Sequence, residues 1–186
     1  MRLFLAIELP RVVREHLRGL QAIVAEYAPK AALVPTENLH LTIKFLGEVD
    51  DRRLAALEES LEKLHRVGVI MLQAQDLECF PLRGPIRIIG AAVGGDLTPL
   101  LALQKAVEQR CQYLGFDTEA RGFRPHITLA RAKAGLPPAA RATLTLAAQS
   151  SWPGPTFTID HFTLMRSVLK PKGAEYHAVR TFTTIA

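Results

Sequence analysis

The pattern His-x-Thr-x occurs twice in this chain, as His40-Leu41-Thr42-Ile43 and His126-Ile127-Thr128-Leu129. Both copies lie in β-like runs, where alternate side chains point to the same face, so each His shares a face with its Thr. Two such units facing each other would offer two imidazoles, which titrate near neutral pH, and two hydroxyl groups. That set can move two protons and hold one phosphate without a metal.

A third triplet, His161-Phe162-Thr163, shows that the short pattern needs context, because random order would give roughly 0.4 occurrences. The context is a repeat in which a leading strand, a helix and a loop precede the motif. His40 and His126 occupy the same place in the two copies of this repeat. The place that corresponds to His161 lies near Gln75 and holds no His, so we interpret His161 as a decoy.

The hydrophobic pattern predicts two related halves, about 1–82 and 83–186, within a single domain. Strands are expected over 2–9, 40–46, 69–72, 77–80, 86–93, 126–130, 157–165 and 176–182. Helices are expected over 13–27, 54–64 and 98–114, with a weaker one over 138–148.

Composition narrows the class of protein. At 48% hydrophobic and 22% charged residues, the 186-residue chain can build a core and is not disordered. The net charge of +5 suits a polyanionic partner, although ordinary solvated Lys and Arg explain it equally well. The two cysteines predict no disulfide framework, and no apolar run or leader points to a membrane or to export. We expect a cytoplasmic protein without metal or cofactor.

Three basic residues are candidates for binding substrate beside the motifs. Lys44 continues the alternation of His40 and Thr42, and Arg124 precedes His126 by two positions. Arg131 lies an odd number of positions after His126, so it would point away from the face of His126 and Thr128 unless its strand bends. Solvated charge is an equally good reading for Lys44 and Arg124.

Paired histidines suit hydrolysis at phosphorus. One imidazole takes a proton from the attacking water while the other protonates the leaving oxygen, and each transfer contributes about 10²–10⁴-fold. Thr hydroxyls can donate to the phosphate oxygens as negative charge develops. A cyclic phosphodiester fits such a site well, because the vicinal ribose hydroxyl is already the leaving group.

The motifs and their flanks resemble the two signatures of the 2H phosphoesterases. Residues 38–47, Asn-Leu-His-Leu-Thr-Ile-Lys-Phe-Leu-Gly, and residues 124–131, Arg-Pro-His-Ile-Thr-Leu-Ala-Arg, are similar to those of the bacterial and archaeal RNA 2′,3′-cyclic phosphodiesterases, also called the 2′-5′ RNA ligase family. The likeness extends over nearly the whole chain.

This resemblance implies an α+β fold of two pseudo-symmetric lobes, each a mainly antiparallel sheet with helices outside, around a central cleft. It implies metal-independent opening of RNA 2′,3′-cyclic phosphate ends to 2′-phosphomonoesters, with 2′-5′ RNA ligase activity in some members. His40 would then protonate the leaving 3′ oxygen, His126 would activate water, and Thr42 and Thr128 would hold the phosphate. The expected partner is RNA, tRNA fragments included, and the expected state is a monomer.

Other readings stay open at this point. The chain could be an RNA-binding module without hydrolysis, although binding alone does not need two titratable imidazoles. The substrate could instead be a small cyclic nucleotide. A metal site is disfavoured, because neither motif has a carboxylate or Cys at ligand spacing.

Overall fold

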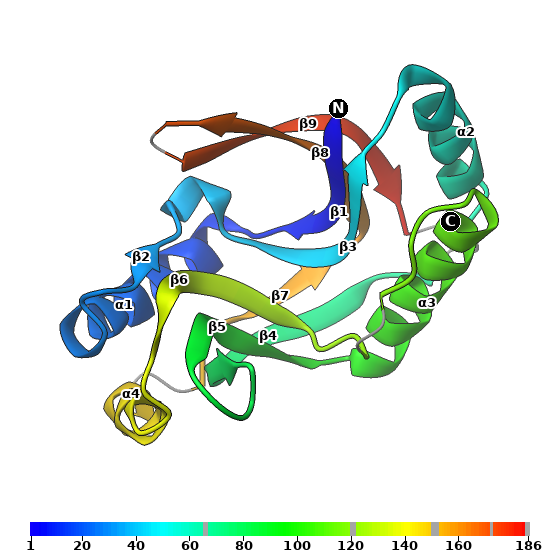
Figure 1. Cartoon of the computed structure of the whole chain (residues 1–186). Helices are drawn as coiled ribbons and strands as arrows, with labels where there is room; N and C mark the ends of the chain where they lie inside the picture. Colours follow the sequence, from blue (N-terminus) through cyan, green and yellow to red (C-terminus); the bar gives the residue numbers. More distant parts are fainter. Residues whose placement is uncertain (65–66, 120–121, 150–152, 172, 185–186) are drawn as a thin grey trace.

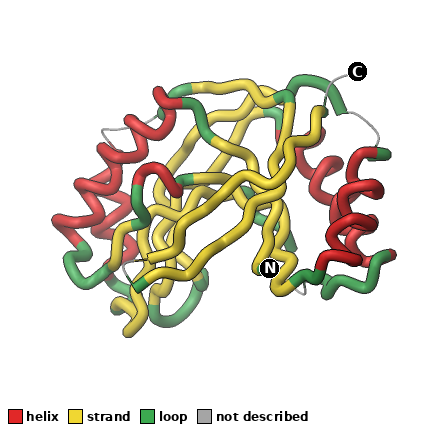
Figure 2. The backbone as a smooth tube through the Cα atoms, turned by 90° about the horizontal axis from the view of Figure 1, so that it is seen from above, coloured by secondary structure: helices red, strands yellow, loops and turns green. Residues whose placement is uncertain are grey.

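A computed structural model of the chain describes residues 1–64, 67–119, 122–149, 153–171 and 173–184. A curled sheet occupies the middle of the molecule, and helices lie at its two sides (Figures 1 and 2). The strands are β1 (Arg2–Glu8), β2 (Ala32–Leu33), β3 (His40–Glu48), β4 (Ile70–Phe80), β5 (Ile86–Gly95), β6 (His126–Leu136), β7 (Thr156–Ile159), β8 (His161–Lys170) and β9 (Gly173–Thr183). The helices are α1 (Arg11–Tyr27), α2 (Asp51–Glu62), α3 (Leu97–Tyr113) and α4 (Ala140–Ala148), with a 3₁₀ turn η1 (Thr36–Asn38).

Two groups of antiparallel strands make up this sheet, whose order is β7-β4-β5-β6-β3-β1-β8-β9 with β2 paired to β6. Lobe A consists of β3, β1, β8 and β9, with α2 and α3 packed beside it. Lobe B consists of β6, β5, β4 and β7, with α1 and α4 packed beside it (Figure 1). The two lobes meet where β3 pairs with β6. The expected α+β fold with two lobes is confirmed.

The lobes do not follow the division of the sequence at about residue 82. Strand β4 comes from the first half but pairs with β5 and β7 in lobe B. Strands β8 and β9 come from the second half but lie in lobe A, where β8 pairs with β1. Helix α3 of the second half likewise contacts β3 of the first. Each lobe therefore needs both halves of the chain.

The helices bury the apolar stripes that the sequence predicts. In α1 the buried side chains are Val13, Leu17, Leu20, Gln21 and Val24. In α3 they are Leu100, Leu103, Val107 and Cys111. Such stripes follow from the 3.6-residue period of a helix that packs one face on a sheet. These helices hold the outer face of each strand group, so the opposite, concave face is left for a site.

Two strands differ from their predicted extents. The run predicted as one strand over 157–165 is two strands, β7 and β8, which separate at Asp160 and join different lobes. The alternation of apolar residues in the sequence does not show that the chain changes its partner strand at this point. Conversely, the stretches predicted over 69–72 and 77–80 form the single strand β4, with an irregularity in its pairing between Ala74 and Leu77.

Both cysteines are buried and neither forms a disulfide. Burial raises the pKa of the Cys111 thiol to about 12, which keeps it protonated and unreactive. In the described part of the chain, no helix combines the length and the apolar character that crossing a membrane requires.

Candidate active site

The two motifs meet at the centre of the sheet, on neighbouring antiparallel strands. The registered pair between β3 and β6 is Leu41 with Ile127, the residue between His and Thr in each motif. Both of these side chains are fully buried. The His and Thr on either side of them therefore point to the opposite, concave face. Because the strands are antiparallel, this register sets each His across from the Thr of the other motif, about a local twofold axis.

The two imidazoles are held in the same way. Nδ1 of His40 donates to the carbonyl oxygen of Asn38 at 2.7 Å, and Nδ1 of His126 donates to that of Arg124 at 2.8 Å. A carbonyl only accepts, so Nδ1 carries the proton in both rings. Nε2 of each ring is left to give or take the proton of a reaction.

Aromatic rings pack against both histidines. The ring centroid of His40 lies 4.9 Å from that of Phe4 and 5.3 Å from that of Tyr176, which meets it edge-on. The ring of His126 lies 4.6 Å from that of Phe80. These contacts limit the movement of the imidazoles, which reduces the reorganisation that proton transfer needs.

Close approach of strand β5 also fixes His126. A Cβ placed on Gly90 would lie 3.3 Å from Cδ2 of His126 and 3.0 Å from the carbonyl oxygen of Ile127. Both distances are tighter than ordinary contact, so glycine gives the ring the room it occupies.

His40 has a hydroxyl partner as well. Its Nε2 lies 3.0 Å from Oγ1 of Thr42, which donates to the neutral ring and accepts from the charged one. Burial is the main cause that lowers the pKa of His40, and the positive charges of Arg131 and His126 lower it further. The bond to the Asn38 carbonyl works in the opposite direction. His40 is thus a weaker base than an ordinary histidine, and its charge is coupled to the second motif.

A β-bulge directly after the first motif reverses the alternation of β3. Leu5 pairs with Lys44 while its neighbour Ala6 pairs with Thr42, so β3 carries one extra residue between them. A bulge of this kind turns every later side chain to the other face.

Strand β6 has a bulge at the same place. Ile89 pairs with Ala130 while Gly90 pairs with Thr128, again with one extra residue. Burial along the first nine residues of β3 and β6 is consequently identical. The bulge returns Arg131 to the face of His126 and Thr128, where its charge acts on His40. The strand does change course after Thr128, which is the condition under which Arg131 was expected to share the face of the motif.

The same geometry contradicts the prediction for Lys44. The bulge turns its side chain into the core, where it is 2% exposed. Its Nζ donates to Oε1 of Glu108 on α3 and to the carbonyl oxygen of Asp117, each at 2.8 Å. Glu108 also accepts from the backbone N–H of Glu119. Lys44 therefore ties β3 to the loop after α3 and does not line the concave face.

Arg124 lies beside His126 as predicted, but its charge is already paired. Its guanidinium forms a 2.5 Å ion pair with Glu78 on β4 and lies 5.8 Å from the centre of the Phe80 ring. The side chain is about half exposed.

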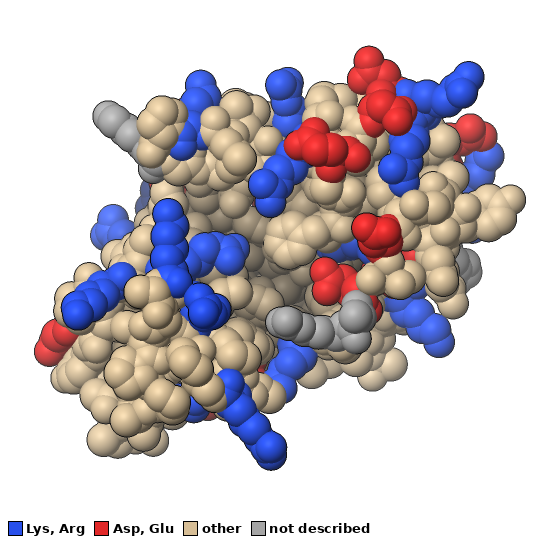
Figure 3. All heavy atoms as spheres, viewed as in Figure 1, with Lys and Arg blue, Asp and Glu red and all other residues tan. Residues whose placement is uncertain are grey.

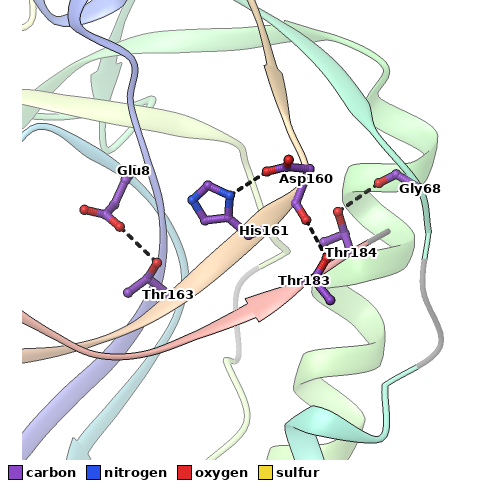
Figure 4. A network of polar contacts seen from close by, with 7 residues as sticks. All are labelled: Glu8, Gly68, Asp160, His161, Thr163, Thr183 and Thr184. Atoms are coloured by element: carbon purple, nitrogen blue, oxygen red, sulfur yellow. Dashed lines mark hydrogen bonds and ion pairs between the residues drawn. The ribbon is translucent and has the colours of Figure 1, made fainter. Parts of the chain in front are cut away.

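The third triplet sits in a different environment, two strands away from β3 (Figure 4). Nδ1 of His161 is 2.6 Å from Oδ1 of Asp160, and that hydrogen bond lowers the pKa of the carboxyl group. The hydroxyl of Thr163 is fully buried and donates to Glu8 at 3.0 Å. Its one hydrogen is thus committed to a carboxylate.

The surface around the motifs is hollowed, and Lys and Arg side chains gather over β2, β6 and α1 at one side of the hollow (Figure 3). Two grooves flank the centre. One of about 400 Å³ lies between α1 and β2, and one of about 310 Å³ lies between η1 and the β8–β9 hairpin. The second reaches His40 through Asn38 and Tyr176, which line it. Within the residues described, no three His, Cys, Asp or Glu side chains cluster as metal ligands would.

Two supporting residues could not be identified as such from the sequence. Asn38 holds the His40 ring by its carbonyl oxygen and bonds the carbonyl of Ala174 on β9 with its amide. Glu108 neutralises Lys44 from a helix 64 residues away. The position of Asn38, two residues before a candidate His, is a signal for the first. Nothing in the local pattern marks the second.

Comparison with known proteins identifies relatives over the whole chain. Residues 9–170 match the family described as the 2′-5′ RNA ligase superfamily. The chain is 35% identical to an RNA 2′,3′-cyclic phosphodiesterase of Thermus thermophilus, covering 98% of this chain and 90% of that protein. It is 30% identical to the protein of the same name from Archaeoglobus fulgidus, covering 98% and 99%.

Solved structures show the same fold. A crystal structure of a Thermus thermophilus protein superposes with a TM-score of 0.81 at 28% identity, covering 99% of this chain and 98% of that one. The Escherichia coli protein LigT, crystallised with 3′-AMP, superposes with a TM-score of 0.77 at 25% identity, covering 98% and 97%.

Proposed function

Because this chain belongs to the 2′-5′ RNA ligase superfamily and is an enzyme of the cyclic phosphodiesterase type, we propose that it hydrolyses RNA 2′,3′-cyclic phosphate ends to 2′-phosphomonoesters by two-histidine acid–base catalysis. The observation that carries this proposal is the local twofold arrangement of the two His-x-Thr units, each with Nδ1 bonded to a carbonyl and Nε2 available.

The reaction needs two proton transfers on opposite sides of one phosphorus atom. His126 takes the proton of the attacking water through Nε2, and the new P–O bond forms as the bond to the 3′ oxygen breaks. His40 delivers its Nε2 proton to that oxygen, which leaves a 3′-hydroxyl and a 2′-phosphate. The resemblance to the family supports this assignment of roles, since the twofold arrangement alone makes them interchangeable. Proton exchange with solvent restores both rings.

The neighbouring groups stabilise the phosphate as its charge grows. Thr42 and Thr128 lie on the face of the imidazoles and donate hydroxyl hydrogens to the non-bridging oxygens. Arg131 supplies a positive charge on the same face. A bound phosphodiester anion also offsets the positive charges that lower the pKa of His40, which favours the protonated ring when substrate is present.

Joining of RNA follows from the same step with a different nucleophile. If the 5′-hydroxyl of another RNA replaces water, its attack on the cyclic phosphate forms a 2′-5′ linkage, and the same two proton transfers apply.

Both motifs lie in one chain, so a monomer supplies the complete set of groups. Fragments of tRNA with cyclic phosphate ends, present in the cytoplasm, have the chemistry that this site requires.

The decisive experiment is hydrolysis of an RNA oligomer ending in a 2′,3′-cyclic phosphate, in the presence of EDTA, by the wild type, His40→Ala and His126→Ala. We expect a 2′-phosphate product from the wild type and a loss of about 10²–10⁴-fold in kcat/KM in each variant. Circular dichroism serves as the control for folding. Activity abolished by EDTA, or retained in either folded variant, would refute the mechanism.

A further inference from the structure

The excess of positive over negative charge in this chain arises from one segment. Residues 120–159 contain five Lys and Arg and no Asp or Glu, while the rest of the chain has 18 of each sign. The whole net charge of +5 thus comes from the segment that contains β6, α4 and β7. A segment with this excess of positive charge in lobe B favours the binding of a polyanion over it.

Two exposed residues of β6, Arg131 and Lys133, follow His126 and Thr128 along the same strand. After the bulge, Arg131 pairs with Ile88 and returns to the face of His126 and Thr128. Arg131 and Lys133 are both exposed on either side of the buried Ala132, so they project to the same side of β6, which has a second irregularity in its pairing between Arg131 and Leu136. Alternate residues of a strand are about 6.7 Å apart, close to the spacing of phosphates in an extended RNA strand. The ion pairs of the described residues include Arg124 but neither Arg131 nor Lys133. Both charges are therefore available to a ligand.

Lobe A offers no equivalent row. In β3 the positions that correspond to Arg131 and Lys133 hold Phe45 and Gly47. On the neighbouring strand the exposed carboxylate of Glu8 lies across from His40. Along β3 an RNA backbone would meet no cation and would pass the carboxylate of Glu8, whereas along β6 it would meet two cations in succession.

We propose that the RNA strand 5′ of the cyclic phosphate runs along β6, with its scissile phosphate at Thr128, Arg131 beside it, and Lys133 bound to the first internucleotide phosphate. This inference rests on the proposed function and specifies its substrate. It implies that a dinucleotide ending in a cyclic phosphate is a better substrate than a mononucleoside cyclic phosphate, because only the dinucleotide has an internucleotide phosphate for Lys133.

The test compares the wild type and Lys133→Gln on three substrates. These are a mononucleoside 2′,3′-cyclic phosphate, a dinucleotide with the same end, and that dinucleotide with an uncharged methylphosphonate link. We expect the wild type to prefer the charged dinucleotide by about two- to fivefold in kcat/KM, the size of one exposed ion pair. Lys133→Gln should lose this preference, show no response to the methylphosphonate, and turn over the mononucleoside like the wild type. Lys105→Gln, an exposed change on α3 in lobe A, is the matched control.

Binding decides the question apart from hydrolysis. The affinity for the dinucleotide product with a 2′-phosphate is measured against salt concentration, and the slope of log K against log[salt] should fall by about 0.7 in Lys133→Gln. An unchanged slope, or a preference for the charged dinucleotide that survives the substitution, would overturn the path along β6. Absence of turnover with intact, Lys133-dependent binding would refute the proposed function and leave the path standing.

Discussion

Strands β3 and β6 share the course of their backbones but carry different side chains after the threonine of each motif. Each begins with His-x-Thr, has a bulge after the Thr, and shows the same order of buried and exposed residues over nine positions. Beyond the Thr the sequences diverge, with Lys44 and Phe45 in β3 where β6 has Ala130 and Arg131. The shared part can move protons on either side of a phosphate. The part that differs makes the two sides of the site unequal, since β6 carries Arg131 and Lys133 where β3 carries Phe45 and Gly47.

The largest difference between the two strands is the buried charge of Lys44 in β3, at the position where β6 has Ala130. We expect Lys44→Met to lower the free energy of unfolding by about 3–5 kcal/mol, because it leaves the Glu108 carboxylate without its cation in the core. Urea denaturation measures the change. The double variant Lys44→Met with Glu108→Leu removes both charges and should recover most of the loss.

The same variants separate a structural role from a catalytic one. Under conditions where Lys44→Met is folded, its kcat/KM should stay within a few-fold of the wild type, because the side chain faces α3 and not the phosphate. A stable but inactive double variant would return Lys44 to the substrate site and contradict the effect of the bulge.

The two threonines test how equal the halves are. Thr42→Val and Thr128→Val each remove one donor to a charged phosphate and should lower kcat/KM by about 10–100-fold. Thr→Ser variants, which keep the hydroxyl, serve as controls and should retain most activity. Thr42 also bonds Nε2 of His40, so its loss should alter the pH dependence in addition to the rate. Wild-type kinetics for both Val variants would remove the threonines from phosphate binding.

Arg131 acts on the opposite lobe through its charge. The pH profile of kcat/KM should be bell-shaped, and the limb that belongs to His40 should lie below 6.5, since its pKa is lowered from that value. If His40 is the acid, it must carry a proton, and activity falls as pH rises through this pKa. Arg131→Gln removes a charge that lowers the pKa, so this alkaline limb should move to higher pH. A profile that does not move in Arg131→Gln would show that the charge of Arg131 does not act on His40.

Sequence reasoning predicted the strands that carry the two motifs and the buried stripes of the helices, because both depend on local periodicity. It failed where one extra residue in a strand reverses the alternation of side chains between the two faces of the sheet. No residue such as a Gly marks the bulges after Thr42 and Thr128 in the sequence. Simple alternation therefore placed Lys44 on the wrong face, and it placed Arg131 beside the motif only on the condition that the strand bends. The separation of β7 from β8 and the partner of Lys44 depend on contacts between distant segments. Those contacts arise only in the folded chain.

The third triplet gives the smallest expected effect and the sharpest test of the comparison. It lies on β8, where Thr163 pairs with Ala6 just as Thr42 does, so its residues share the concave face with the first motif. Yet the Thr163 hydroxyl donates to Glu8 and the His161 ring bonds Asp160, and two carboxylates beside these groups oppose the binding of a phosphate (Figure 4). We therefore expect His161→Ala to keep kcat/KM within about twofold of the wild type, since a half-exposed surface change rarely perturbs a fold. A folded His161→Ala protein that lost activity to the extent of His40→Ala would mean that three histidines, and not a twofold pair, perform the chemistry.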